Sequence, residues 1–220
     1  MIMTRTPLRI SFVGGGSGST ASGWFSGISG GRRNEASDTC AMVGGGSFNA
    51  ARGKYSLIVG GGGSALSDSN SVAPGAMWGA LVGGHQNRVS GPNGFVGGGQ
   101  RNDATSNSVV GGGYNNSTLD DYTFVGGGIN NTASGFASTV AGGYYAKARG
   151  DYSTVCGGGG MSVFDSNSTI GAYSTIPGGT ANRASGDYSL AAGRRARANH
   201  IGSFVWGASN SSTDSTASFN

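Results

Sequence analysis

The sequence contains few of the residues on which common folds and sites depend. Of its 220 residues only 11% are charged, and there are two cysteines and two histidines. No run of about eighteen apolar residues occurs, which excludes a membrane-spanning helix. The first ten residues contain Arg5 and Arg9 but no apolar run after them, so they do not form a recognisable signal peptide.

Glycine is abundant instead, at 46 of 220 residues, and it opposes helix formation. Low hydrophobicity with much glycine and serine is also typical of disordered chains, but disordered chains do not hold a register. Here an apolar residue, a spacer and Gly-Gly, often followed by Asn, recur about every fifteen residues, as in Val125–Gly135 and Val96–Ala104. Such a short fixed period indicates stacked coils, a solenoid.

The apolar residue of each repeat serves as its anchor. Thirteen anchors follow one another at spacings of 14 or 15 residues, except for two spacings of 23 and 21: Val13, Ile28, Val43, Ile58, Leu81, Val96, Val110, Val125, Val140, Val155, Ile176, Ala191 and Val205. Fifteen residues suit two short strands and two tight turns. We therefore predict an all-β solenoid of 14–15-residue coils, about 60 Å long, with the anchors from Val43 to Ile176 as its structural core.

Other columns keep fixed distances from the anchor. The Gly-Gly pair is expected where the backbone takes positive φ. An Asn recurs six residues after seven anchors: Asn34, Asn49, Asn87, Asn102, Asn116, Asn131 and Asn182. Because Asn tolerates the left-handed region, we expect these at a turn corner, with a possible ladder of stacked side-chain amides. Small residues eight positions after the anchor predict a second strand packed across a narrow interior.

An aromatic row lies three residues before seven anchors: Phe25, Tyr55, Trp78, Tyr122, Tyr152, Tyr173 and Tyr188. Serine is common one residue later. Because side chains alternate faces along a strand, we expect Ser to share the anchor's face and the aromatics to share the other face with Phe12, Leu57 and Phe124. Both faces would then be apolar. One fills the interior and the other needs a partner, which predicts a homo-oligomer.

We predict one repeat domain at 11–208, preceded by a lead-in at 1–10 and followed by a tail at 209–220. Two longer excursions interrupt the repeat, at residues 60–77 and 157–174. Both carry Asp-Ser-Asn-Ser. Loops on a rigid scaffold often bind ligands, although tolerated insertions are the favoured alternative. The candidate ligand-binding residues are Asp68, Asn70, Asp165, Asn167, Arg194 and Arg195.

The net charge of +4 is modest, with local basic clusters at Arg32–Arg33 and Arg194–Arg197. These clusters contact phosphate or acidic glycans, or are solvated turn arginines, the interpretation that we favour. The aromatics repeat coil by coil and do not interleave with a basic groove. We therefore expect no nucleic-acid partner.

Nothing in the sequence indicates catalysis. His85 and His200 belong to no metal-ligand cluster. Repeated acids such as Asp151 are typical of turns, and the Gly-x-Gly matches lack the helix that a phosphate or dinucleotide loop requires. We predict no catalytic, cofactor-binding or metal-binding residues and no cofactor. Cys40 and Cys156 would lie about 35 Å apart in stacked coils, too far to pair, and are expected to pack as small apolar residues.

The segments Ser189–Ala198 and Gly150–Val155 resemble the fourteen-residue head repeat of trimeric autotransporter adhesins, the YadA-like head. The resemblance covers roughly Ser11–Gly207. It implies a left-handed parallel β-roll, three chains side by side and a surface-exposed adhesive head, with no catalytic residues. The neck, coiled-coil stalk and C-terminal membrane barrel of such adhesins are not visible in this sequence.

The expected function is a non-enzymatic adhesin head, extracellular or on a cell surface, with its signal and anchor outside this sequence. Expected partners are the chain itself, as a homotrimer, and a host or extracellular protein or glycan, without direct membrane insertion. The alternatives are a structural fibre or spacer segment and a phage tail-fibre receptor-binding module. Ice binding ranks lower, because only Thr139, Thr154 and Thr175 form the threonine row it would need.

Overall fold

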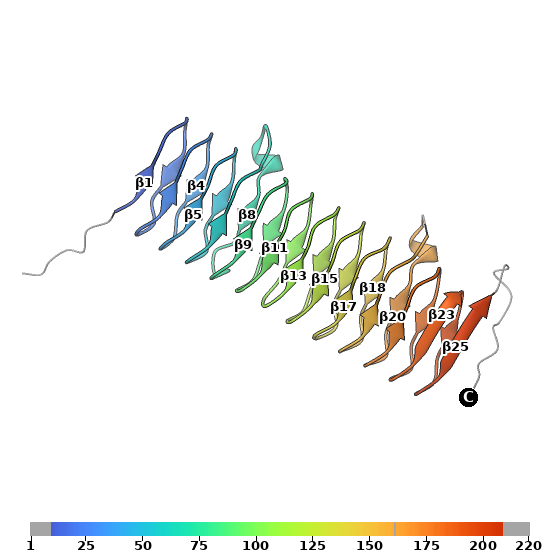
Figure 1. Cartoon of the computed structure of the whole chain (residues 1–220). Helices are drawn as coiled ribbons and strands as arrows, with labels where there is room; N and C mark the ends of the chain where they lie inside the picture. Colours follow the sequence, from blue (N-terminus) through green and yellow to red (C-terminus); the bar gives the residue numbers. More distant parts are fainter. Residues whose placement is uncertain (1–9, 161, 209–220) are drawn as a thin grey trace, which may run out of the picture.

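The computed structural model describes residues 10–160 and 162–208, so most of the lead-in and all of the tail lie outside the described residues. The chain forms a stack of coils, and each coil gives one short strand to each of two sheets (Figure 1). All strand pairs are parallel, and neighbours in a sheet are two apart in chain order. The predicted all-β solenoid of about fifteen-residue coils is confirmed.

The first sheet has thirteen strands, which carry the anchors. They are β1 (Phe12–Val13), β3 (Gly27–Ile28), β5 (Met42–Val43), β7 (Leu57–Ile58), β9 (Ala80–Leu81), β11 (Phe95–Val96), β13 (Val109–Val110), β15 (Phe124–Val125), β17 (Thr139–Val140), β19 (Thr154–Val155), β21 (Thr175–Ile176), β23 (Leu190–Arg194) and β25 (Phe204–Ala208).

The second sheet has twelve strands. They are β2 (Thr20–Ala21), β4 (Glu35–Ala36), β6 (Ala50–Ala51), β8 (Ser71–Val72), β10 (Arg88–Val89), β12 (Asp103–Ala104), β14 (Ser117–Thr118), β16 (Thr132–Ala133), β18 (Lys147–Ala148), β20 (Ser168–Thr169), β22 (Arg183–Ala184) and β24 (Arg197–Ala198). Two short 3-10 helices, η1 (Leu66–Asp68) and η2 (Val163–Asp165), complete the elements of the described residues.

The core is one row of side chains from each sheet. Anchors pair with anchors in register, as Val96 does with Val110 and Val125 with Val140, and these four are fully buried. Val13 is the exception at 44% exposure, because its coil is the first of the array. The facing row is small, mostly alanine with an occasional Val or Thr, so the two sheets approach closely.

Glycine is required three residues after the anchor. Gly128 has φ +88°, and a Cβ built there would lie 2.3 Å from the carbonyl oxygen of Gly143 in the next coil. Any larger residue would therefore push adjacent coils apart as well as strain its own backbone. This close approach explains why the second glycine of the pair recurs in nearly every repeat, whereas a Cβ on the first, such as Gly127, would meet nothing closer than 3.9 Å.

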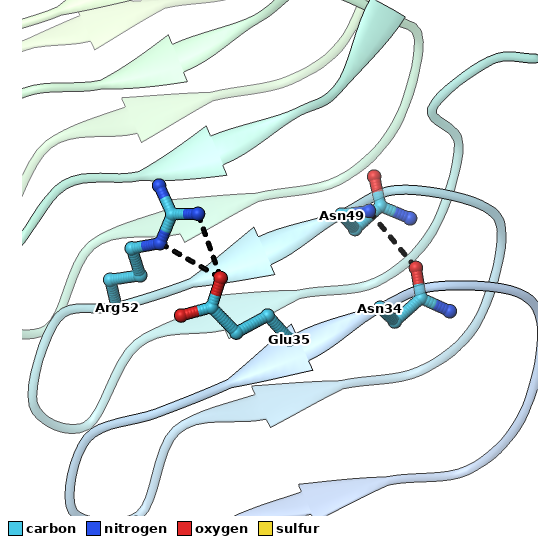
Figure 2. Close-up of polar contacts among 4 residues, drawn as sticks. All are labelled: Asn34, Glu35, Asn49 and Arg52. Carbon is cyan, nitrogen blue, oxygen red and sulfur yellow. Dashed lines mark hydrogen bonds and ion pairs between the residues drawn. The ribbon is translucent and has the colours of Figure 1, made fainter. Parts of the chain in front are cut away.

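The asparagine column is a buried ladder of nine residues, all at most 1% exposed: Asn34, Asn49, Asn70, Asn87, Asn102, Asn116, Asn131, Asn167 and Asn182. The backbone N–H of Asn49 donates to Oδ1 of Asn34 at 3.0 Å, as Figure 2 shows. Each Nδ2 donates to glycine carbonyls, as Asn131 does to Gly127 at 2.8 Å.

Two details of the asparagine prediction were wrong. None of the nine has positive φ; in the seven ordinary coils the left-handed corner residue is the one before the asparagine, such as Asn130 with φ 56°, whereas Ser69 and Ser166 before Asn70 and Asn167 are extended. Successive asparagines of the ladder are joined mainly by hydrogen bonds between a side chain and the backbone. Only Asn70 donates from its side-chain amide to the amide of a neighbour, Asn49, at 3.2 Å. The side chain therefore replaces missing backbone partners at the turn.

The aromatic row also differs from expectation. The strands of most coils are only two residues long, so strand alternation does not reach three residues back. The aromatics instead occupy the left-handed corner between the second strand and the next anchor, for example Tyr152 with φ 57° and Tyr173 with φ 57°. The N–H of Tyr173 donates to the carbonyl of Asp151 in the preceding coil at 2.8 Å. This inter-coil bond offsets the strain of a bulky residue at positive φ.

The excursions are shorter than the predicted ranges. In ordinary coils the buried residue of the second strand follows the anchor by 8 positions, whereas Val72 follows Ile58, and Thr169 follows Val155, by 14. The six extra residues in each case come before the ladder asparagine. By Ser71 and Ser168 the chain is back in the second sheet, paired in register.

Candidate binding surfaces

The outward faces of the two sheets differ in chemistry. The first sheet points the residue before each anchor outward, and this column contains no charged side chain: Phe12, Gly27, Met42, Leu57, Ala80, Phe95, Val109, Phe124, Thr139, Thr154, Thr175, Leu190 and Phe204. Among them Leu57 is 42% and Phe124 is 40% exposed. We call this column the apolar face.

The second sheet points a polar column outward. It consists of Thr20, Glu35, Ala50, Ser71, Arg88, Asp103, Ser117, Thr132, Lys147, Ser168, Arg183 and Arg197. Glu35 pairs in register with Ala50 of the next coil, and Arg52, two residues after Ala50, forms an ion pair with Glu35 at 2.7 Å (Figure 2). The hydrogen bond from Arg52 holds the pKa of the Glu35 carboxyl below its ordinary value, against a smaller opposing effect of burial. The array is thus amphipathic across its thickness.

The aromatic row forms ring stacks along one edge. Tyr173 lies between Tyr152 and Tyr188, with ring centroids 4.9 and 5.0 Å apart and planes within 6° of parallel. Tyr55 and Trp78 stack at 5.8 Å. These distances are close to the spacing of paired strands, so coil stacking itself sets the ring stacking. The rings stay about half exposed, which leaves their outer edges available for contact.

The excursions emerge together at the other edge. Both 3-10 helices lie between a first and a second strand, and Figure 1 shows them on the same side of the array. Leu66 is 75% and Phe164 is 88% exposed at their tips. The Asp68 carboxylate accepts from the backbone N–H of Ser64 at 3.2 Å and closes its own loop.

The six candidate ligand-binding residues do not form one site. Asn70 and Asn167 are fully buried in the ladder, and their amides bond glycine carbonyls, so neither offers a group to a ligand. Asp68 and Asp165 sit in the two separate 3-10 helices. Arg194 is exposed, and Arg195 is a corner residue with φ 60° on the edge that carries the excursions.

The described residues contain no group of three or more His, Cys, Asp and Glu side chains positioned to hold a metal ion. Within the same residues no helix is long and apolar enough to cross a membrane. Both cysteines are free. Cys40 is partly buried at a left-handed corner, but Cys156 is exposed, so the expectation that it packs as a small apolar residue was wrong.

Sequence reasoning missed the contrast between the two outward faces, although the column before the buried alanines already alternates charged and small polar residues. It also missed the positive φ of twenty corner residues other than glycine in the part of the chain that the structure describes, because most of them, the aromatics and arginines above all, are residue types that do not signal that conformation. No protein-family model matches the chain, and no curated protein matches it significantly. The functional argument therefore rests on the surfaces themselves.

Proposed function

We propose that this chain is a non-enzymatic binding head of an extracellular fibre, formed by three copies side by side. The arrangement is that of the YadA-like heads of trimeric autotransporter adhesins, with left-handed coils. The apolar face carries the proposal, because it runs the length of the array without a charged side chain and needs a cover that one chain does not provide.

The size of the apolar face favours assembly. Its rows extend over twelve coil intervals, about 60 Å at the spacing of paired strands. An exposed surface of this length that is uncharged and largely apolar, interrupted only by Thr139, Thr154 and Thr175 among its side chains, is unusual for a monomer and typical of an interface. Burying Leu57, Phe95 and Phe124, each 36–42% exposed, would add hydrophobic stabilisation without any charge to desolvate.

A second copy fits this face better than another occupant. Coils of two copies repeat at the same spacing along the array. The outward side chains of one copy can therefore meet those of the other at every coil instead of at a few points. The stacked corner aromatics, such as Tyr152 and Tyr173, border the same sheet and extend the contact. Closed symmetry with three copies would leave no apolar face uncovered.

The excursions favour a binding role over a plain spacer. They lie on the edge opposite the aromatic row, so an interface built on the apolar face leaves them accessible. Their tips expose Leu66 and Phe164, which contribute nothing to the core. Exposed loops on a rigid scaffold are common sites of recognition.

The proposal is tested by removing both excursions without disturbing the coils. Residues 63–69 and 160–166 are each replaced by one Asn, the residue that occupies the equivalent corner at positions 115 and 130. The replacement returns Asn70 and Asn167 to six positions after their anchors, the count of ordinary coils. Attachment of the intact chain and of this variant is compared on arrays of glycans and matrix proteins, and each mass is measured by sedimentation.

A binding head predicts that the variant stays trimeric and loses attachment. A trimer with undiminished attachment would assign the excursions no role and support the spacer alternative. Monomeric intact chain would refute the assembly on which the proposal depends.

A further inference from the structure

Basic side chains converge beside the second excursion. Lys147, Ser168, Arg183 and Arg197 occupy one outward column on four consecutive rungs. Together with Arg149, which follows β18, and Phe164 from η2 they line a cavity of about 200 Å³. The excursion forms one wall of this cavity and the polar sheet forms its floor.

The cavity has an uncompensated positive charge. The only ion pair among the described residues joins Arg52 and Glu35, several coils away, and no acid lines this cavity. Burial lowers the pKa of Arg197, and the nearby charges of Arg183 and Arg195 lower it further. The charged guanidinium is thus held where it lacks a counterion, which an anion would supply.

A buried hydroxyl without a partner also lies in the cavity floor. Ser168 is only 8% exposed, and its Oγ makes no hydrogen bond. Buried polar atoms are nearly always paired in folded proteins, so this atom marks a place where a ligand oxygen can accept its proton. Arg183 is held by a bond from Nε to Oγ of Ser185 at 2.9 Å, which fixes one cation of the cluster.

The first excursion provides an internal comparison. Its column runs through Ala50, Ser71, Arg88 and Asp103, in the positions of Lys147, Ser168, Arg183 and Arg197. Only one of the three cations, Arg88, is therefore present there. Lys147 is replaced by Ala50, and Arg197 is replaced by the acid Asp103. The equivalent of Arg149 is Arg52, which Glu35 neutralises. The fold thus accommodates an excursion without this cluster.

We propose that the cavity binds a sulfate or phosphate ester carried by an acidic polysaccharide. Cations and a hydroxyl supply charge-assisted hydrogen bonds to an oxyanion, and Phe164, 88% exposed, offers an apolar surface to the sugar ring. A volume of about 200 Å³ is below that of a pocket for a whole drug-sized ligand, so it suits one substituted sugar of a longer chain.

The arrangement favours a polysaccharide over a nucleic acid. Single-stranded nucleic acids bind where aromatic side chains are interleaved along a basic groove. Here one phenylalanine accompanies the cations, and the aromatic row runs along the opposite edge. The inference names a ligand class for the proposed binding head and in that respect rests on the proposed function.

The experiment uses the full chain and four probes: a heparin hexasaccharide, its desulfated counterpart, a phosphorylated hexasaccharide and a single-stranded oligonucleotide of similar charge. Affinities are measured by calorimetry at several salt concentrations. Arg183→Gln is compared with Arg88→Gln, which removes the same side chain from the same column position beside the first excursion. Arg183→Lys keeps the charge, and thermal unfolding checks that each variant is folded.

We expect a sulfated or phosphorylated hexasaccharide to bind and the desulfated one not to bind. Arg183→Gln should weaken that binding about tenfold and reduce the salt dependence by about one counterion, whereas Arg88→Gln should leave both unchanged. Whichever ester binds more tightly identifies the source of the oxyanion. Arg183→Lys should retain most of the affinity.

The inference would be overturned if neither ester bound, or if Arg183→Gln and Arg88→Gln lost the same affinity. It would also be overturned if the oligonucleotide bound more tightly than both esters. The proposed function is assessed separately by sedimentation and by attachment to arrays. A trimer whose attachment needs the excursions but is unaffected by Arg183→Gln would refute this site and leave the proposed function standing.

Discussion

Replacing Asn131 by Ala tests what holds one coil to the next. Asn131 is fully buried, and its Nδ2 donates to the carbonyls of Gly127 and Gly143 at 2.8 and 2.9 Å. Its Oδ1 accepts from the backbone N–H of Ala146 at 2.8 Å. The carbonyl of Gly143 keeps a second donor, Ile129, at 3.0 Å. The substitution therefore leaves two backbone groups without a partner, at Gly127 and Ala146.

A buried group left unpaired costs about 1–3 kcal/mol, and this applies to the N–H of Ala146, whereas the partly exposed carbonyl of Gly127 can bind water, so Asn131→Ala should reduce the free energy of unfolding by about 1–3 kcal/mol. The matched control is Asn199→Ala, which removes the same amide from an exposed position and should change stability by no more than about 0.5 kcal/mol. Urea denaturation at one fixed protein concentration measures both.

Amide hydrogen exchange localises the effect. The N–H of Ala146 should be protected in the intact chain and exchange much faster in the Asn131→Ala variant, together with amides of the two adjoining coils, because each coil contacts mainly its neighbours. A stability loss no greater than that of Asn199→Ala, with Ala146 still protected, would show that the ladder does not join the coils.

Three other predictions follow from the corners, the ion pair and the apolar face. Ala137→Gly should raise stability by about 0.5–1 kcal/mol in urea denaturation, because Ala137 has φ 52°, which glycine adopts without strain. The control, Ala133→Gly in the buried strand β16, should lower stability. A loss of stability in both variants would contradict the assigned corner strain. The lowered pKa of Glu35 means that its pair with Arg52 stabilises the fold above the ordinary carboxyl pKa and loses this effect as pH falls through the lowered value. The stability difference between intact chain and Arg52→Gln should thus be a few tenths of a kcal/mol at neutral pH and vanish in acid, and a difference that persists at low pH would exclude this cause. Leu57→Lys with Phe124→Lys should dissociate the trimer in sedimentation, whereas Ser117→Lys with Thr132→Lys on the polar face should not; equal effects would refute the choice of face.

The anchors could be predicted from the sequence because burial requires an apolar residue at one position in every coil. Val96, Val110, Val125 and Val140 satisfy that requirement at spacings of 14 or 15 residues. The same regularity located the glycine turns and the second strand. A short period combined with strict burial therefore determines the coil and its length.

Counting from the anchor failed where residues were inserted between the strands. Asn70 and Asn167 lie 12 positions after their anchors rather than 6, so they appeared to belong to the loops and not to the ladder. Their burial became evident only from the hydrogen bonds of the structure. The ligand-binding prediction for both residues rested on that displaced count.

The corners and the basic cavity depend on contacts between coils, which single-residue preferences do not contain. Tyr173 adopts positive φ because its N–H reaches the preceding coil, against the usual preference of a bulky residue. Lys147 and Arg197 are 50 positions apart in the sequence and share one outward column because the coils stack in register, and the excursion adds a wall beside that column. The periodicity of the sequence predicted the coils, whereas the grouping of side chains on the surface became evident only from the structure.

The mass of the intact chain in solution tests the central claim that the apolar face is covered by further copies. Sedimentation equilibrium over a hundredfold range of concentration should give three times the chain mass, with Trp78 and Tyr152 less accessible to surface-labelling reagents than in the Leu57→Lys, Phe124→Lys variant. A single-chain mass throughout that range, with the apolar face open to solvent, would contradict the account.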